Sequence, residues 1–170
     1  MGAAPCERKD MNHLRIDPAS AADAATIFGL IKELAEFEHL SHEVVATEES
    51  LREQLFGEQP GAEVIIGRVG GEVVGFALYF PNFSTFLGRR GLYLEDLYVR
   101  PQFRGQGHGE QLLRHLAHLC VERGYGRLEW SVLDWNQRAI DFYQSMGAKP
   151  MNEWTVFRVT GDALAKLGGA

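Results

Sequence analysis

The sequence is poor in cysteine and has no long apolar run. It has 2 cysteines among 170 residues: Cys6 near the start, and Cys120 on the apolar side of a predicted helix, where we expect a buried, inert thiol. No uninterrupted apolar stretch approaches the roughly 20 residues that a membrane-spanning helix needs. Residues 1–12 also lack the apolar core of a secretory signal. We therefore predict a cytoplasmic protein without a membrane partner.

Positive charge is also scarce. The formal net charge is -6, which argues against general nucleic-acid binding. Nine Glu and one Arg lie between Glu33 and Glu63, whereas five Arg and two Glu lie between Arg100 and Arg127. The first region should repel anions and the second should attract them. No cluster of metal ligands is visible, so we expect no metal.

The spacing of apolar residues predicts a flexible leader over 1–13 and a single domain over 14–170. Gly70-Gly71 between two β-rich runs predicts a hairpin. Strands mixed with helices in this order indicate an α+β domain with a partly antiparallel sheet, not a doubly wound dinucleotide fold. Strands are expected at 14–16, 64–69, 73–80, 92–99, 127–133 and 153–159, helices at 20–37, 48–56, 110–123 and 137–146, a loop at 81–91 and a frayed turn at 162–167.

A glycine-rich turn separates the strand at 92–99 from the helix at 110–123. Alternating glycines let backbone N–H groups approach a ligand, and the helix that follows directs its unpaired N–H groups and positive dipole end to the same place. A phosphate or pyrophosphate is the natural occupant. The alternative is a strand-to-helix connection that binds nothing, and the spacing alone leaves both open. The turn consists of Arg104, Gly105, Gln106, Gly107, His108 and Gly109.

Four segments in this order together resemble the GNAT superfamily of acetyl-CoA-dependent N-acetyltransferases. They are Leu94-Glu95-Asp96-Leu97-Tyr98-Val99, the glycine turn, Trp135-Asn136, and Phe142-Tyr143 before Met146-Gly147-Ala148. The resemblance covers about 14–159 and is strongest to the diamine (spermidine/spermine) acetyltransferase group, in particular its thialysine-preferring branch. It implies a mixed, mostly antiparallel central sheet flanked by helices, with a splayed strand pair that binds the cofactor, and it implies a homodimer.

The resemblance also implies how acetyl-CoA is held. The backbone of Leu97, Tyr98 and Val99 would pair with the pantetheine arm, and the turn from Arg104 to Gly109 would hold the pyrophosphate. Asn136 would orient the cofactor or the following helix. A plain helix cap is an equal alternative for Asn136, and one side chain can serve both purposes.

The chemistry needs a base and an acid. A lysine-like ammonium has a reference pKa of about 10.4 and must lose a proton before it attacks the thioester. By the resemblance, Glu95 would remove that proton directly or through a water, and Tyr143 would protonate the departing thiolate. The alternatives are an exposed strand carboxylate for Glu95 and a tyrosine packed on the sheet for Tyr143.

The substrate is expected to be a small cation. By the family geometry, Glu36, Glu38, Glu95 and Asp96 would gather near the amine, and Trp154 would add an aromatic wall. The loop at Ser84 resembles the thialysine-preferring branch, because the polyamine branch has an acidic residue there. The alternatives are solvated helix surface for the glutamates and a core position for Trp154.

Three functions remain open at this point. The first is acetylation of a thialysine, lysine-like or diamine substrate. The second is acetylation of a protein lysine or N-terminus, which needs an open groove. The third is an acyl-CoA-binding regulator without turnover, which would need neither Glu95 nor Tyr143.

Overall fold

The structure, a computed structural model, describes residues 13–169 and divides into two compact units at Ser131/Val132. The predicted leader and Cys6 lie outside the described residues, apart from His13 at the leader's end. The single domain predicted over 14–170 stays a prediction, and the two units are described separately. No helix within residues 13–169 is long and apolar enough to cross a membrane.

The first unit is built on a five-stranded sheet with the strand order β1-β2-β3-β4-β5. Neighbouring strands pair antiparallel from β1 to β4, and only the β4–β5 pair is parallel. This confirms the predicted mixed, mostly antiparallel sheet. The strands are β1 (Arg15–Pro18), β2 (Glu63–Val69), β3 (Glu72–Ser84), β4 (Arg89–Val99) and β5 (Leu128–Trp130).

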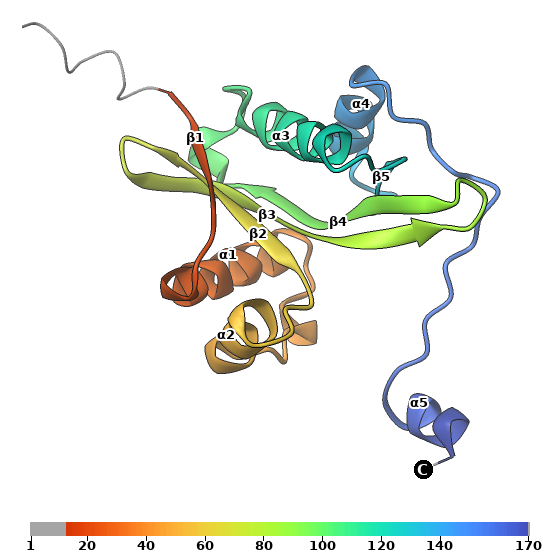
Figure 1. Cartoon of the computed structure of the whole chain (residues 1–170). Coiled ribbons are helices and arrows are strands. Elements are labelled where there is room, and N and C mark those ends of the chain that lie inside the picture. Colours follow the sequence, from red (N-terminus) through yellow and green to blue (C-terminus); the bar gives the residue numbers. More distant parts are fainter. Residues whose placement is uncertain (1–12, 170) are drawn as a thin grey trace, which may run out of the picture. The chain divides into compact units, whose positions relative to one another are not determined.

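Helices cover both faces of this sheet (Figure 1). α1 (Ala24–Phe37) and α2 (Glu48–Phe56) lie on one face, and α3 (His108–Glu122) lies on the other. Short 3-10 turns at Ala21–Asp23, Ser41–Glu43 and Pro101–Phe103 complete the unit. The core below the sheet joins the two helices to three strands through Ile27, Leu30, Leu34, Leu55, Val64, Ile66, Phe76, Leu78 and Tyr98.

Helix α3 packs on the opposite face through an apolar stripe at helical spacing. A Cβ added to Gly67 would lie 3.1 Å from a Leu14 methyl and 3.7 Å from a Leu112 methyl, so the backbone of β2 approaches α3 closely. Alternate residues of β2 therefore serve two cores, which explains its nearly continuous apolar sequence. The buried residues of α3 are His108, Leu112, Leu113, Leu116 and Cys120.

The β3–β4 hairpin is longer than the sequence predicted. The expected loop over 81–91 is mostly strand, because the ladder continues from Pro81 opposite Leu92 to Ser84 opposite Arg89. Proline removes only one ladder donor, so the strand pair tolerates it at this position. The β2–β3 hairpin is as predicted, with Gly70 and Gly71 at φ 57° and 87°.

The second unit contains two helices, α4 (Gln137–Ser145) and α5 (Gly161–Gly168). The expected strand at 153–159 does not form in it, and the expected frayed end at 162–167 is helical. A strand needs a neighbour that accepts its backbone hydrogen bonds, and residues 132–169 contain no other strand. Trp154, Val156 and Phe157 are exposed there.

Candidate acetyl-transfer site

The glycine turn leaves its backbone accessible. Gly105 and Gly107 have φ of 77° and 80°, which glycine adopts without strain. A Cβ added at either position would meet no atom within 4 Å, so open space adjoins both. Gly107 is the N-cap of α3, a helix of 15 residues. The first N–H groups of such a helix have no partner inside it, so the turn has the features that a pyrophosphate needs.

Beside this turn, β4 separates from β5. The parallel ladder has three pairs and ends where Leu94 faces Trp130. β4 continues to Val99, so Leu97, Tyr98 and Val99 extend beyond the last β5 pair. This is the predicted splayed strand pair, and its open side offers backbone groups that an extended amide-containing ligand can pair with.

A β-bulge in β4 decides which way its acidic residues face. Leu78 pairs with Asp96 and Tyr79 pairs with Leu94, so Glu95 is the extra residue without a partner on β3. A bulge shifts the alternation of side chains by one position. Asp96 therefore lies on the face of Leu78 and Tyr98, toward α1, whereas Leu94 lies on the other face. Glu95 is exposed at the bulge.

The end of α1 brings further negative charge to Asp96. Glu38 is the C-cap of α1, and its charge raises the pKa of Asp96 together with burial and Glu95. Burial is the largest cause, and the pKa of Asp96 rises from 3.8 to about 6. Burial also raises the pKa of Glu38. Glu36 lies in the last turn of the same helix and is exposed.

These carboxylates are not neutralised within the described part of the chain. Glu36, Glu38, Glu95 and Asp96 form no ion pair with any of residues 13–169. Glu33 differs, because Arg100 binds it with two nitrogens at 2.7 and 3.0 Å. Glu36 and Glu38 lie at the negative end of the α1 dipole, and the charges of Glu38 and Glu95 act on Asp96. Glu38, Glu95 and Asp96, called the acidic cluster below, repel one another and therefore favour a cationic ligand at a cost in stability.

The side chain of Arg104 has contacts that the sequence did not predict. Its Nε donates to the Val99 carbonyl at 2.7 Å. Its guanidinium carbon lies 4.4 Å from the Phe37 ring centroid and 5.4 Å from that of Tyr98. The side chain therefore packs toward α1, on the side of the acidic cluster.

His108 is a residue of the turn whose environment the sequence did not reveal. It is 6% exposed, and neither ring nitrogen has a hydrogen-bond partner among residues 13–169. Burial lowers its pKa. Its ring packs edge-on toward Phe103, with centroids 6.4 Å apart. The imidazole thus occupies a position at the sheet-facing start of α3 that suits an apolar side chain.

Ser84 lies apart from the acidic cluster. It is buried at the end of β3, and its Oγ accepts a hydrogen bond from the Leu87 N–H at 3.2 Å. Along β3, Ser84 is six residues beyond Leu78, the partner of Asp96, which corresponds to about 20 Å at the usual strand rise. The contact of Ser84 with the amine stays a prediction.

The remaining predicted residues belong to the second unit. Asn136 is the N-cap of α4, and its Oδ1 accepts the Ala139 N–H at 3.2 Å. The capping role is thus present, and the cofactor role stays a prediction. Tyr143 lies in α4, with its ring centroid 5.2 Å from that of Phe142. Trp154 is 69% exposed in the segment that follows, so its expected core alternative does not hold within this unit.

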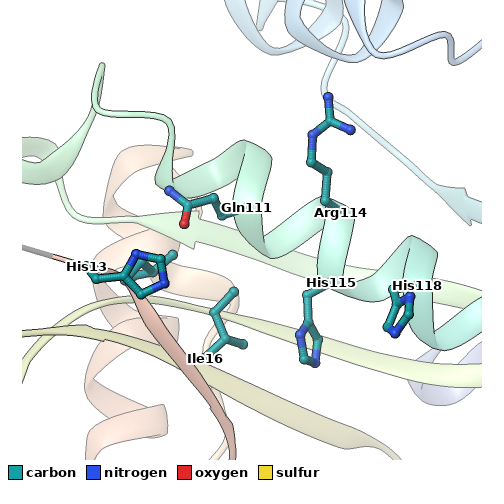
Figure 2. Close-up of a pocket in the computed structure, with 7 residues that line it drawn as sticks. His13, Ile16, Gln111, Arg114, His115 and His118 are labelled. Carbon is teal, nitrogen blue, oxygen red and sulfur yellow. The ribbon is translucent and has the colours of Figure 1, made fainter. Parts of the chain in front are cut away.

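A separate hollow of about 450 Å³ lies between the start of β1 and the side of α3 (Figure 2). Gln111, His115 and His118 project from α3 toward His13 and Ile16, whereas Arg114 points away. Burial and His118 lower the pKa of His115. Despite these imidazoles, no three His, Cys, Asp or Glu residues among 13–169 are placed to hold a metal ion.

Comparison with known proteins places the chain in a family. Residues 30–148 match the acetyltransferase (GNAT) family. This range contains the splayed strand pair, the bulge and the glycine turn. The chain belongs to the GNAT family of acetyltransferases and is an enzyme of that class. Enzymes of this family use acetyl-CoA as the acetyl donor.

Comparison with individual proteins shows which acetyltransferases the chain is similar to. The chain is 39% identical to a thialysine N-epsilon-acetyltransferase of Bos taurus, over 94% of this chain and 99% of that protein. It is 34% identical to the L-ornithine N5-acetyltransferase NATA1 of Arabidopsis thaliana, over 90% and 87%. Among solved structures, an integron cassette protein of V. cholerae superimposes with a TM-score of 0.78 at 29% identity, over 92% and 98%.

Proposed function

We propose that the protein transfers an acetyl group from acetyl-CoA to the primary amine of a small cationic substrate such as thialysine, lysine or ornithine. The observation that carries this proposal is the acidic cluster, which has no ion-pair partner among residues 13–169, near an accessible glycine turn. Relatives that act on thialysine and ornithine support it. Both substrates are small molecules with a terminal ammonium next to a short aliphatic or thioether chain.

The residues divide into a group that holds the donor and a group that holds the amine. The backbone of Leu97, Tyr98 and Val99 and the turn from Arg104 to Gly109 hold acetyl-CoA, which supplies the acetyl group as a thioester. Glu36, Glu38 and Asp96 attract the substrate's ammonium group. Asn136, Ser84 and Trp154 complete the proposed cofactor and substrate contacts.

Proton transfer is assigned to two residues. Glu95 takes a proton from the ammonium, directly or through one water, and so frees the nitrogen lone pair for attack on the acetyl carbon. Its place in the bulge leaves the carboxylate exposed and beside the splayed strands. Tyr143 donates a proton to the sulfur as the carbon–sulfur bond breaks.

The proposal is tested by measuring acetyl-CoA consumption with a panel of amines. The panel contains thialysine, lysine, ornithine, spermidine, putrescine and a lysine-containing peptide. We expect a lysine-like amine to give the highest kcat/KM and spermidine a lower one. A higher kcat/KM for the peptide would favour the protein-acetylating alternative, and binding of acetyl-CoA without turnover of any amine would favour the regulator.

We also propose a homodimer. Phe83 and Phe86 are 60% and 93% exposed on the β3–β4 hairpin. Neighbouring exposed aromatic side chains of this kind are candidates for an association surface. Light scattering at micromolar concentration should give twice the 19.0 kDa chain mass, and a monomeric mass would contradict the proposal.

A further inference from the structure

Arg104 connects the glycine turn to the acidic cluster through its side chain. Its backbone begins the turn, whereas its guanidinium stacks over Phe37 at 4.4 Å and Tyr98 at 5.4 Å. The hydrogen bond that Arg104 Nε donates to the Val99 carbonyl at 2.7 Å fixes the guanidinium to the end of β4. A planar guanidinium is suited to this dual contact, because it donates in its plane and stacks with its faces.

Both rings adjoin residues of the proposed amine site. Phe37 is the last residue of α1 and precedes Glu38. Tyr98 follows Asp96 by two residues on the same face of β4. Phe37 is 37% exposed, so part of its ring stays outside the core and is open to the guanidinium. The guanidinium is therefore one of the contacts that join the end of α1 to β4.

We propose that Arg104 is a positioning residue for the amine site: its guanidinium holds Phe37, and through it Glu38, at the correct distance from Asp96. This inference rests on the proposed function and assigns to the side chain a role other than contact with pyrophosphate. Its loss therefore weakens amine binding and leaves acetyl-CoA binding nearly unchanged.

Electrostatics alone predicts the opposite sign for amine binding. Removing a positive charge near a cation site should favour the cation. If Arg104 acts only as a nearby charge, Arg104→Gln lowers the KM for the amine. If it positions Glu38, the same substitution raises the KM, and Phe37→Leu, which keeps the apolar volume and removes the ring face, raises it too.

The test is a double-mutant cycle on the full chain, with lysine-like amine and acetyl-CoA as ligands. We expect Arg104→Gln and Phe37→Leu each to raise the amine KM about fivefold, within the range of a cation–π contact. The double variant should raise it no more than the larger single effect, because both remove one interaction. The acetyl-CoA dissociation constant should change less than twofold, and Phe37→Tyr, which keeps the ring, should retain the wild-type KM.

Arg114→Gln is the matched control. It removes the same charge from α3, the helix that follows the turn, but Arg114 is an exposed partner of Glu110 at 2.8 Å and is not stacked on either ring. It should leave both constants unchanged. Thermal unfolding of every variant confirms that the KM values refer to folded protein.

Three outcomes overturn the inference. A tenfold rise in the acetyl-CoA dissociation constant of Arg104→Gln, with the amine KM unchanged, assigns its side chain to the pyrophosphate. An unchanged or lowered amine KM removes the positioning role, and multiplying effects in the double variant show that the two residues act separately. Failure of the wild-type protein to acetylate any amine would instead contradict the proposed function.

Discussion

The acidic cluster and the glycine turn are built from different parts of the chain. The cluster presents the side chains of Glu38, Glu95 and Asp96, and its properties depend on their charge and burial. The turn presents backbone at Gly105 and Gly107, and its properties depend on the absence of side chains. The acidic cluster should therefore be sensitive to a change of charge, whereas the glycine turn should be sensitive to almost any added side-chain atom.

The largest effect is expected at Tyr143, the proposed proton donor, which belongs to neither the acidic cluster nor the glycine turn. Tyr143→Phe keeps the ring and removes only the hydroxyl. If Tyr143 protonates the leaving sulfur, kcat should fall about a hundredfold or more with acetyl-CoA affinity nearly unchanged. The maximal rate and the acetyl-CoA dissociation constant, measured on one preparation, check this. A loss below about threefold would return Tyr143 to a packing role.

The second effect tests the turn's dependence on bare backbone. Gly107→Asp places a carboxylate where the pyrophosphate is expected, and we expect acetyl-CoA affinity to fall about thirtyfold by charge repulsion and steric exclusion. Gly124→Asp is the control, because Gly124 also has a positive φ and open space beside it, but lies beyond the other end of α3. Both variants should lose about 1–2 kcal/mol of stability. Equal acetyl-CoA affinities by calorimetry would remove the turn from the cofactor site.

The third effect tests the cluster's dependence on charge. Asp96→Asn should raise the amine KM about tenfold by removing a charge-assisted contact. It should also stabilise the free protein. The folded-state pKa of Asp96 is about 6, above its unfolded value of 3.8, so the native state loses stability as pH rises through that interval.

The stability gain from Asp96→Asn should therefore be about 1–2 kcal/mol at pH 8 and about half as large at pH 5. Denaturant unfolding at the two pH values measures it. Glu53→Gln, on the exposed side of α2, is the charge control and should show no such gain. A destabilised Asn variant at pH 8 would show that Asp96 is held by favourable contacts instead.

The smallest effect concerns the start of α3. His108→Leu removes two buried nitrogens that lack partners within residues 13–169, and should stabilise the protein by about 1 kcal/mol at pH 7.5. Burial lowers the folded-state pKa of His108, so the wild-type protein loses stability as pH falls below the unfolded value near 6.5. The advantage of the Leu variant should grow from pH 7.5 to pH 5.5 in denaturant unfolding, and a constant difference would exclude this titration as its cause.

Sequence reasoning succeeded where a local pattern has one physical solution. Gly70-Gly71 required a tight hairpin turn, and the apolar stripe of α3 required a helix on a sheet face. The glycine turn was predicted for the same reason, since its backbone conformation needs glycine. The strand at 153–159 failed because alternation predicts a strand only if a neighbouring strand exists, and the second unit offers none.

The candidate site was only partly predictable. That Glu38 and Asp96 lie close together follows from the packing of α1 on β4, which no local pattern encodes. The sequence also did not distinguish Glu33, which pairs with Arg100, from Glu38, which pairs with no described residue. The direction of the Arg104 side chain depends on Phe37 and Tyr98, two rings from other segments of the chain. The sequence shows only the glycines next to Arg104, and these predict a contact with the cofactor instead.

The bulge at Glu95 gives β4 one residue more than regular pairing with β3 needs. The bulge absorbs this extra residue, so Leu94 and Asp96 face opposite sides of the sheet although they are two positions apart. Deleting Glu95 would leave Leu94 opposite Tyr79 and Asp96 opposite Leu78 in regular pairing, so Asp96 and Tyr98 would keep the face toward α1. A deletion of one codon would therefore remove the proposed base and preserve the strand and both of its faces.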